Sequence, residues 1–75
     1  MDSGMTGAPI KVAVNGETRE LTDAMTVAAL VEMLGYGGRR IAVEVNQAIV
    51  PRSLYGQCEL AEGDVIEIVQ AIGGG

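Results

Sequence analysis

Residues 64–75 read Asp-Val-Ile-Glu-Ile-Val-Gln-Ala-Ile-Gly-Gly-Gly and end the chain. The first part is almost continuously apolar around one glutamate, which is typical of a strand at the centre of a sheet. Ile66 and Ile68 share one face of this strand, and Val69 points to the other. We therefore predict a central last strand that is covered by a helix on one face and followed directly by a glycine tail.

The tail consists of Gly73, Gly74 and Gly75, and the lack of a Cβ makes such a segment thin and flexible. Fully extended, residues 71–75 would reach roughly 17 Å, at about 3.3–3.6 Å per residue. That reach would let the Gly75 carboxylate enter a partner's active site, where it would need activation to become an acyl donor. A frayed or cloning-derived end is the alternative explanation of a terminal glycine run.

Two aliphatic side chains beside this tail are candidates for partner docking. Val69 lies on the strand face away from the helix, and Ile72 lies between the strand and the glycines. An ordinary exposed aliphatic residue is an equally common explanation of Val69, because such residues occur on most protein surfaces.

Composition limits the function of the chain. Its 75 residues make one small domain, and a net charge of −5 disfavours nucleic acid and anionic membranes but favours a basic protein partner. The absence of histidine removes the commonest general base and metal ligand. We expect no membrane span, no bound cofactor or metal and no catalysis by the chain itself, and a cytoplasmic location.

The single cysteine, Cys58, excludes an internal disulfide and any metal site built from several cysteines. With no histidine in the chain and acidic neighbours, its thiolate would be disfavoured, so we interpret it as a small structural residue.

The remaining elements follow from periodicity. Residues 1–9 are small and polar and are interpreted as a disordered leader or a cloning remnant. Residues 10–14 alternate, Asn-Gly turns the chain at 15–16, and residues 17–22 return with Leu21 facing inward, which predicts a hairpin. Further strands are predicted at residues 41–45 and 48–50, the second ended by Pro51.

A helix is predicted between these strands. Thr26 is its expected N-cap and Gly35 its expected stop, because glycine readily adopts the left-handed conformation. Four apolar residues at i, i+3, i+4 and i+7 form its inward face: Val27, Leu30, Val31 and Leu34. Met25 and Met33 are interpreted as flexible packing.

Two segments carry no regular pattern. Residues 36–40 contain Gly37 and Gly38, but the spacing of a phosphate-binding loop is missing, so we predict a solvated loop. Residues 52–60 predict a short turn of helix and a loop, anchored by Leu54 and Leu60.

The order of elements and the Gly-Gly end resemble the β-grasp fold of ubiquitin and its prokaryotic sulfur-carrier relatives. Within that group the chain resembles the ThiS family, over about residues 10–75. It rests on Val43-Glu44-Val45-Asn46, Ile49-Val50-Pro51-Arg52-Ser53, Leu60, Gly63-Asp64 and the strand leading to Gly-Gly. Tyr55 stands where the family often has Trp, and Gly73 precedes the usual glycine pair.

The resemblance implies an α+β, ubiquitin-like β-grasp domain at residues 10–72, with a mixed sheet of four to five strands, one main helix on one face and a flexible tail at residues 73–75. It also implies a sulfur carrier. A ThiF-type partner would use ATP and magnesium to adenylate Gly75, and a cysteine desulfurase or other persulfide donor would convert the adenylate to a thiocarboxylate. A ThiG-type thiazole synthase would accept the sulfur for the thiazole of thiamine.

Two other functions stay open at this point. The small subunit of molybdopterin synthase is a similar carrier, although its relatives tend to lack the Val-Pro-Arg-Ser segment and to have prolines before the tail. A ubiquitin-like protein modifier would instead join Gly75 to a lysine by an isopeptide bond.

Overall fold

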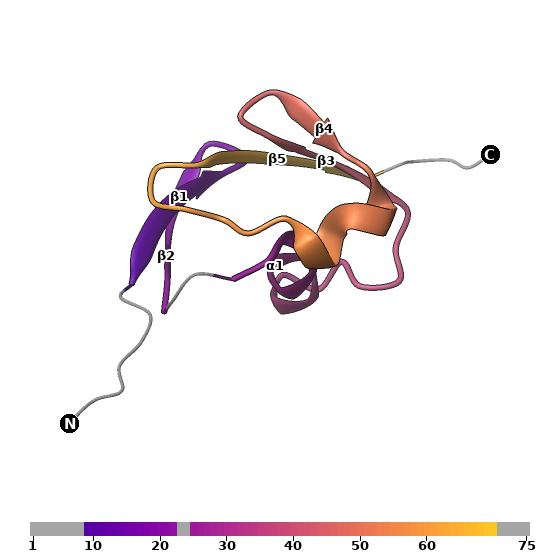
Figure 1. The fold of residues 1–75 in the computed structure, drawn as a ribbon, viewed down its shortest axis with the longest axis horizontal. Helices are drawn as coiled ribbons and strands as arrows, with labels where there is room; N and C mark the ends of the chain where they lie inside the picture. The colour runs from indigo at the N-terminus through magenta and orange to yellow at the C-terminus, as the bar shows by residue number, and fades with distance from the viewer. Residues whose placement is uncertain (1–8, 23–24, 71–75) are drawn as a thin grey trace.

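A computed structural model describes residues 9–22 and 25–70 of the chain. Two elements besides the strands shape the fold, the helix α1 and the 3₁₀ helix η1 (Figure 1). In chain order the elements are β1 (Ile10–Val14), β2 (Glu17–Leu21), α1 (Val27–Met33), β3 (Ile41–Val45), β4 (Ala48–Val50), η1 (Arg52–Gln57) and β5 (Val65–Gln70). The predicted leader and tail lie almost entirely outside the described residues.

The strands form one mixed sheet in the order β2-β1-β5-β3-β4. β1 and β5 run parallel, and every other neighbouring pair is antiparallel. The last strand is therefore the middle strand, as its apolar sequence predicted, and the sheet reaches the upper limit of the predicted four to five strands. Figure 1 shows α1 on one face of this sheet, which confirms the α+β architecture.

Both hairpins turn through left-handed backbone. Asn15 and Gly16 have φ of 51° and 85°, as expected of the Asn-Gly turn. Asn46 and Gln47 have φ of 53° and 71°, so the second turn has the same sign of φ at both central residues although it contains no glycine. A glutamine in this region costs roughly 1–2 kcal/mol, which the pairing of β3 with β4 must offset.

The predicted helix ends are confirmed. The Thr26 hydroxyl oxygen accepts a hydrogen bond from the Ala29 N–H at 3.2 Å, and Thr26 itself has extended backbone. Gly35 has φ of +87° directly after the C-cap Leu34. Val27, Leu30 and Val31 are buried, so the predicted stripe faces the sheet.

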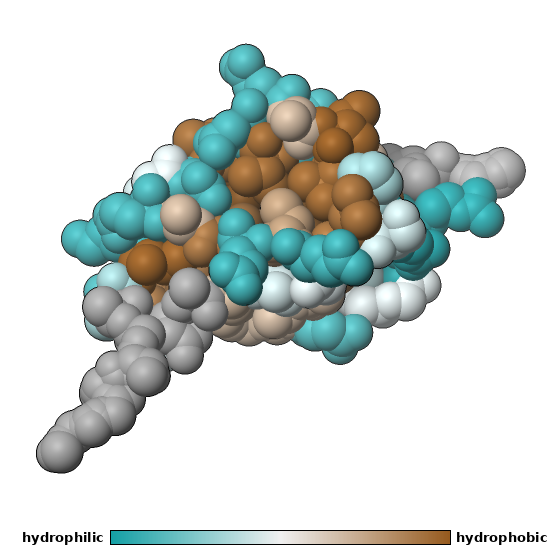
Figure 2. Space-filling view, viewed as in Figure 1, coloured by the Kyte–Doolittle hydropathy of each residue, from teal (hydrophilic) through white to brown (hydrophobic). Residues whose placement is uncertain are grey.

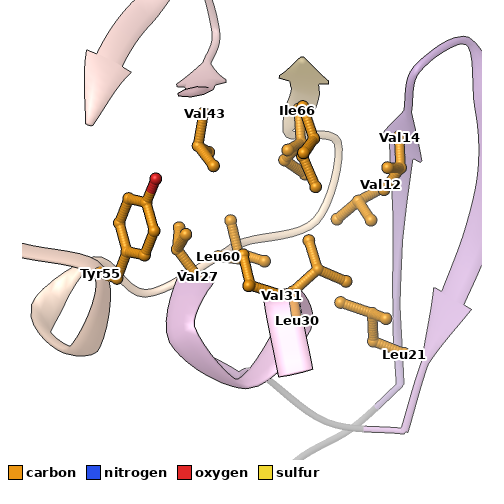
Figure 3. Close-up of a cluster of buried hydrophobic side chains, with 11 residues drawn as sticks. Val12, Val14, Leu21, Val27, Leu30, Val31, Val43, Tyr55, Leu60 and Ile66 are labelled. Atoms are coloured by element: carbon orange, nitrogen blue, oxygen red, sulfur yellow. The ribbon is translucent and has the colours of Figure 1, made fainter. Parts of the chain in front are cut away.

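The core lies between α1 and the inner face of the sheet (Figure 3). Aliphatic side chains from the strands point toward those of the helix and of the segment before β5. Its buried members are Val12, Val14, Leu21, Val27, Leu30, Val31, Val43, Tyr55, Leu60, Ile66 and Ile68. In the described ranges no polar or charged residue is buried. The hydrophobic effect is therefore the main source of stability.

Two packing predictions are wrong. Leu54 is 44% exposed, while Tyr55, one residue later, is buried in the core. The reason is the 3₁₀ geometry of η1, in which neighbouring side chains point about 120° apart, so Tyr55 faces inward while Leu54 faces out. Met33 is 52% exposed because it lies about 200° around the α-helix from buried Val31.

Neither helix among the described residues has the length and apolar character needed to cross a membrane.

Candidate functional site

The outer face of the sheet presents the side chains of the central strand that do not enter the core. Ile66 and Ile68 are buried, whereas Val65 and Val69 are 47% and 62% exposed, so the predicted alternation in β5 is confirmed. The neighbours of these valines in register are Ala13 and Ala42. Because the alanines are small and the valines are exposed, the outer face carries a shallow apolar surface that extends along β5 as far as Val69.

Two carboxylates interrupt this apolar surface. Glu67 of β5 lies directly opposite Glu44 of β3 in the antiparallel register. Like charges directly opposite each other on neighbouring strands destabilise a sheet. A cationic group from outside would relieve the repulsion, so the outer face offers both apolar contact and a place for a basic side chain.

The end of β5 is held by Asn15. β1 pairs with β5 through Ala13 and Val14, and beyond this point the Asn15 side chain continues the pairing. Its Oδ1 accepts from the Ile68 N–H at 2.8 Å, and its Nδ2 donates to the Ile68 carbonyl at 3.2 Å. The Asn15 N–H also donates to the Ile66 carbonyl at 2.9 Å. One turn residue thus fixes the strand that leads to the tail.

Replacing Asn15 should therefore loosen the end of β5. We expect Asn15→Ala to lower the free energy of unfolding by about 1–3 kcal/mol, because it strips partners from partly buried backbone groups and places alanine at positive φ. Urea unfolding and hydrogen exchange at the Ile68 amide measure the loss. Asn15→Asp is the matched control, since it keeps the acceptor and tolerates the turn. Wild-type exchange at Ile68 in the alanine variant would contradict the assigned role.

The polar residues in the family-like motifs also have structural roles. Asp64 accepts from Asn46 Nδ2 at 3.0 Å through Oδ1 and from the Ala61 N–H at 2.8 Å through Oδ2. The Asn46 Oδ1 accepts from the Val65 N–H at 2.9 Å, and Gly63 has φ of +87°. These contacts tie the turn before β5 to the β3–β4 hairpin, so the motif positions the start of the central strand.

Only part of the predicted site lies in the described structure. Val69 is exposed on the outer face, at the end of the central strand. Ile72, Gly73, Gly74 and Gly75 lie outside the described residues, so their assigned roles stay predictions. The last described residue of β5, Gln70, pairs with Ile41, which places the start of β3 beside the point where the chain continues.

Cys58 lies beside β4, one of the two edge strands of the sheet. It is half-buried and lines a groove of about 290 Å³ together with Ile49, Val50, Pro51, Leu54 and Gln57. Figure 2 shows hydrophobic side chains over β4 in this region. The Cys58 carbonyl accepts from the Val27 N–H at 2.8 Å, so the residue anchors the start of α1. Residues 9–22 and 25–70 hold no cluster of three metal-ligating side chains.

Sequence reasoning missed two features of the site. The Asn-Gly pair indicated a turn but carried no sign that Asn15 would contact Ile68, 53 residues away. The arginines at positions 39 and 40 were assigned to a solvated loop, whereas the pairing of Ile41 with Gln70 brings that loop to the end of β5.

Comparison with solved structures places the fold. A crystal structure of the thiamine biosynthesis protein ThiS from Geobacter metallireducens superposes with a TM-score of 0.76. The match covers 88% of this chain and 100% of that one at 23% sequence identity. This likeness confirms the ubiquitin-like β-grasp architecture.

Sequence comparison finds relatives of two lengths. The sulfur carrier protein ThiS of Escherichia coli is 32% identical over 66 residues, which cover 88% of this chain and all of that protein. A thiazole synthase of Paramagnetospirillum magneticum is 48% identical over 66 residues, and a second from Magnetococcus marinus is 41% identical. The chain spans only 20% of the length of each of these two synthases.

The model of the ThiS family matches residues 12–75, which include the central strand, the Gly-Asp turn before it and the three final glycines. A match over this much of the chain, together with the full-length likeness to the Escherichia coli protein, establishes the relationship that the motifs indicated. The chain belongs to the ThiS family.

Proposed function

We propose that this chain is a sulfur carrier in the biosynthesis of the thiamine thiazole, and that it carries sulfur as a thiocarboxylate on Gly75. The observation that carries the proposal is the family match that extends through Gly75, on a chain that aligns with the whole of a sulfur carrier protein. The two thiazole synthases with a matching segment favour thiazole formation as the destination of the sulfur.

The chemistry requires a partner, because a carboxylate is a poor acyl donor. In the activating enzyme, an oxygen of the Gly75 carboxylate attacks the α-phosphorus of ATP, and magnesium pyrophosphate leaves. The terminal sulfur of a persulfide then attacks the acyl carbon and displaces AMP. A donor thiol attacks the sulfur still bonded to the donor cysteine, which releases the thiocarboxylate and leaves a disulfide on the donor.

In this scheme the chain supplies a handle and a docking surface, and the partner supplies the charge stabilisation for phosphoryl transfer. Val69 and Ile72 are the proposed apolar docking residues. The Glu44–Glu67 pair provides a place for a basic partner side chain between Val65 and Val69. The activating enzyme, the persulfide donor and the thiazole synthase would each bind transiently, because each must release the same tail.

Charging the apolar part of this surface should weaken the complex. We expect Val69→Asp to raise the KM of the activating enzyme for the carrier by about tenfold, which corresponds to about 1.4 kcal/mol of binding free energy. Thr22→Asp is the matched control, since it adds the same charge at an exposed position just beyond the edge strand β2, at the end of the sheet opposite Val69. Steady-state adenylation measures both, and equal effects would exclude Val69 from the interface.

Intact mass tests the function itself. The purified chain is incubated with a ThiF-type enzyme, MgATP, a loaded persulfide donor and a thiol, alongside a chain that lacks Gly75. A gain equal to the exchange of one oxygen for one sulfur, absent from the control, supports the proposal. No gain, with an activating enzyme shown to act on its own carrier, contradicts it. Conjugates of higher mass in cell extracts would support a protein modifier instead.

A further inference from the structure

Three of the five cationic side chains of the protein gather at one end of the sheet. Arg39 and Arg40 precede Ile41, which pairs with Gln70 at the end of β5. The Arg52 Nη2 donates to the Arg39 carbonyl at 3.3 Å, which joins the start of η1 to the same loop. All three arginines are exposed, and we call them the arginine patch. Figure 1 shows β3, η1 and β5 meeting at this end.

The opposite end of β5 is acidic. Glu62 and Asp64 lie in the turn that leads into Val65, and the Glu62 carboxylate is held by the Lys11 N–H at 2.9 Å. The whole chain has a net charge of −5, so the arginine patch is a local exception in a negatively charged molecule. The two ends of the central strand therefore differ in the sign of their charge.

Local structure keeps the patch in a defined place. A hollow of about 170 Å³ is lined by residues of both α1 and η1, and Arg39 and Arg52 line it together with Tyr36 and Tyr55. Glu32 also lines this hollow, with its carboxylate packed against Gly37. One carboxylate and two arginines line the hollow, which leaves an excess of positive charge there. Tyr55 is buried in the core and anchors η1, which fixes the backbone position of Arg52 at the start of that helix.

We propose that the arginine patch docks against an acidic surface of the activating enzyme and thereby sets the orientation in which the carrier arrives. The inference rests on the proposed function, because it concerns the enzyme that receives the tail. The positive charges of the patch attract carboxylates over a distance, which steers the carrier before contact. An acidic partner surface would attract this end of the carrier and repel the rest of it.

Repulsion between the negatively charged remainder of the carrier and the acidic enzyme surface selects the orientation of the carrier. A carrier with a net charge of −5 gains no general attraction to an acidic surface. Approach to the acidic surface is favourable only when the arginine patch faces the enzyme. The end of β5 lies beside the patch and therefore faces the enzyme as well. Charges at the rim of an interface act mainly on the association rate. The patch should therefore change KM and leave the chemical step unchanged.

Charge reversal with a matched control tests the inference. The patch variant is Arg39→Glu with Arg40→Glu, which spares the Arg52 hydrogen bond because that bond uses the Arg39 carbonyl. The control is Lys11→Glu with Arg19→Glu, on β1 and β2, which makes the same change in net charge at exposed positions. A third variant, Arg39→Lys with Arg40→Lys, keeps the charge. Circular dichroism verifies that all three variants fold.

The measurement is ATP–pyrophosphate exchange by the activating enzyme, with KM for the carrier and kcat determined at low and high salt. We expect the reversed patch to raise KM by about tenfold or more with kcat unchanged, because association depends on complementary charge. The control and the lysine variant should stay within about threefold of wild type. The difference should shrink at about 1 M salt, where the screening length falls to about 3 Å.

Each other outcome overturns the inference. Equal effects of the patch variant and its control would show that net charge alone matters. A fall in kcat at unchanged KM would place the arginines at the reacting groups. Exchange with the wild-type chain distinguishes the carrier function from the docking role of the arginine patch. If the wild-type chain supports exchange and reversing the patch leaves KM unchanged, only the docking role is refuted. No exchange with the wild-type chain would overturn the proposed function and the docking inference together.

Discussion

Deleting Gly75 should abolish thiocarboxylate formation and leave the thermal unfolding midpoint unchanged. The deletion moves the terminal carboxylate back to Gly74, about 3.3–3.6 Å short of the position that Gly75 would reach, so we expect it to miss the α-phosphorus of ATP and to gain no sulfur. It removes no contact of the core, whose buried members all lie between Val12 and Ile68. Intact mass after the sulfur-transfer reaction and a thermal melt monitored by circular dichroism provide the two measurements.

Gly74→Ala provides the companion variant. It keeps the length of the tail and the terminal carboxylate but adds one methyl group where the tail would have to pass through a narrow channel. We expect it to abolish sulfur transfer as well, again with an unchanged melt. A large loss of stability in either variant would contradict the placement of the tail outside the core.

Leu30→Ala and Ile66→Ala should each lower the free energy of unfolding by about 2–5 kcal/mol, the usual cost of truncating a buried aliphatic side chain. Both residues are 0% exposed, on α1 and on the central strand, and Figure 3 shows them in the same cluster. Small domains have only about 5–15 kcal/mol in total, so either change removes a large share. Urea unfolding at fixed temperature measures it.

Ile49→Ala is the control for these truncations. Ile49 is 71% exposed on the edge strand β4, so the same kind of truncation there should change stability by no more than about 0.5 kcal/mol. Wild-type stability in both core variants would mean that the assigned core is wrong. An equal loss in all three variants would mean that burial does not govern the effect.

The regular elements could be predicted because their patterns are local. Alternation in residues 65–70 correctly assigned Ile66 and Ile68 to the core and Val69 to the outer face. The Thr26 cap and the Gly35 stop were also correct, since each depends on backbone geometry within one turn of the helix. The central place of the last strand followed from its continuous hydrophobicity.

The error at Leu54 arose where the period of the backbone was unknown. Leu54 was predicted as an anchor, but in the 3₁₀ helix η1 its neighbour Tyr55 faces inward and Leu54 faces out. The hydrogen bonds between the Asn15 side chain and Ile68 depend on where the parallel pairing of β1 with β5 ends, and no local sequence pattern indicates that position. The arginine patch likewise depends on the register of β3 against β5.

The placement of β5 has a consequence for how the protein is made. β5, the last of the five strands in chain order, lies in the middle of the sheet between β1 and β3, so a nascent chain holds two separate halves of a sheet until β5 emerges. Folding then waits for contacts that are distant in sequence, which slows it. A chain cut short before β5 loses the glycines and the centre of its sheet together. Incomplete translation products should therefore stay unfolded and be degraded, instead of competing with intact carriers for the enzymes of sulfur transfer.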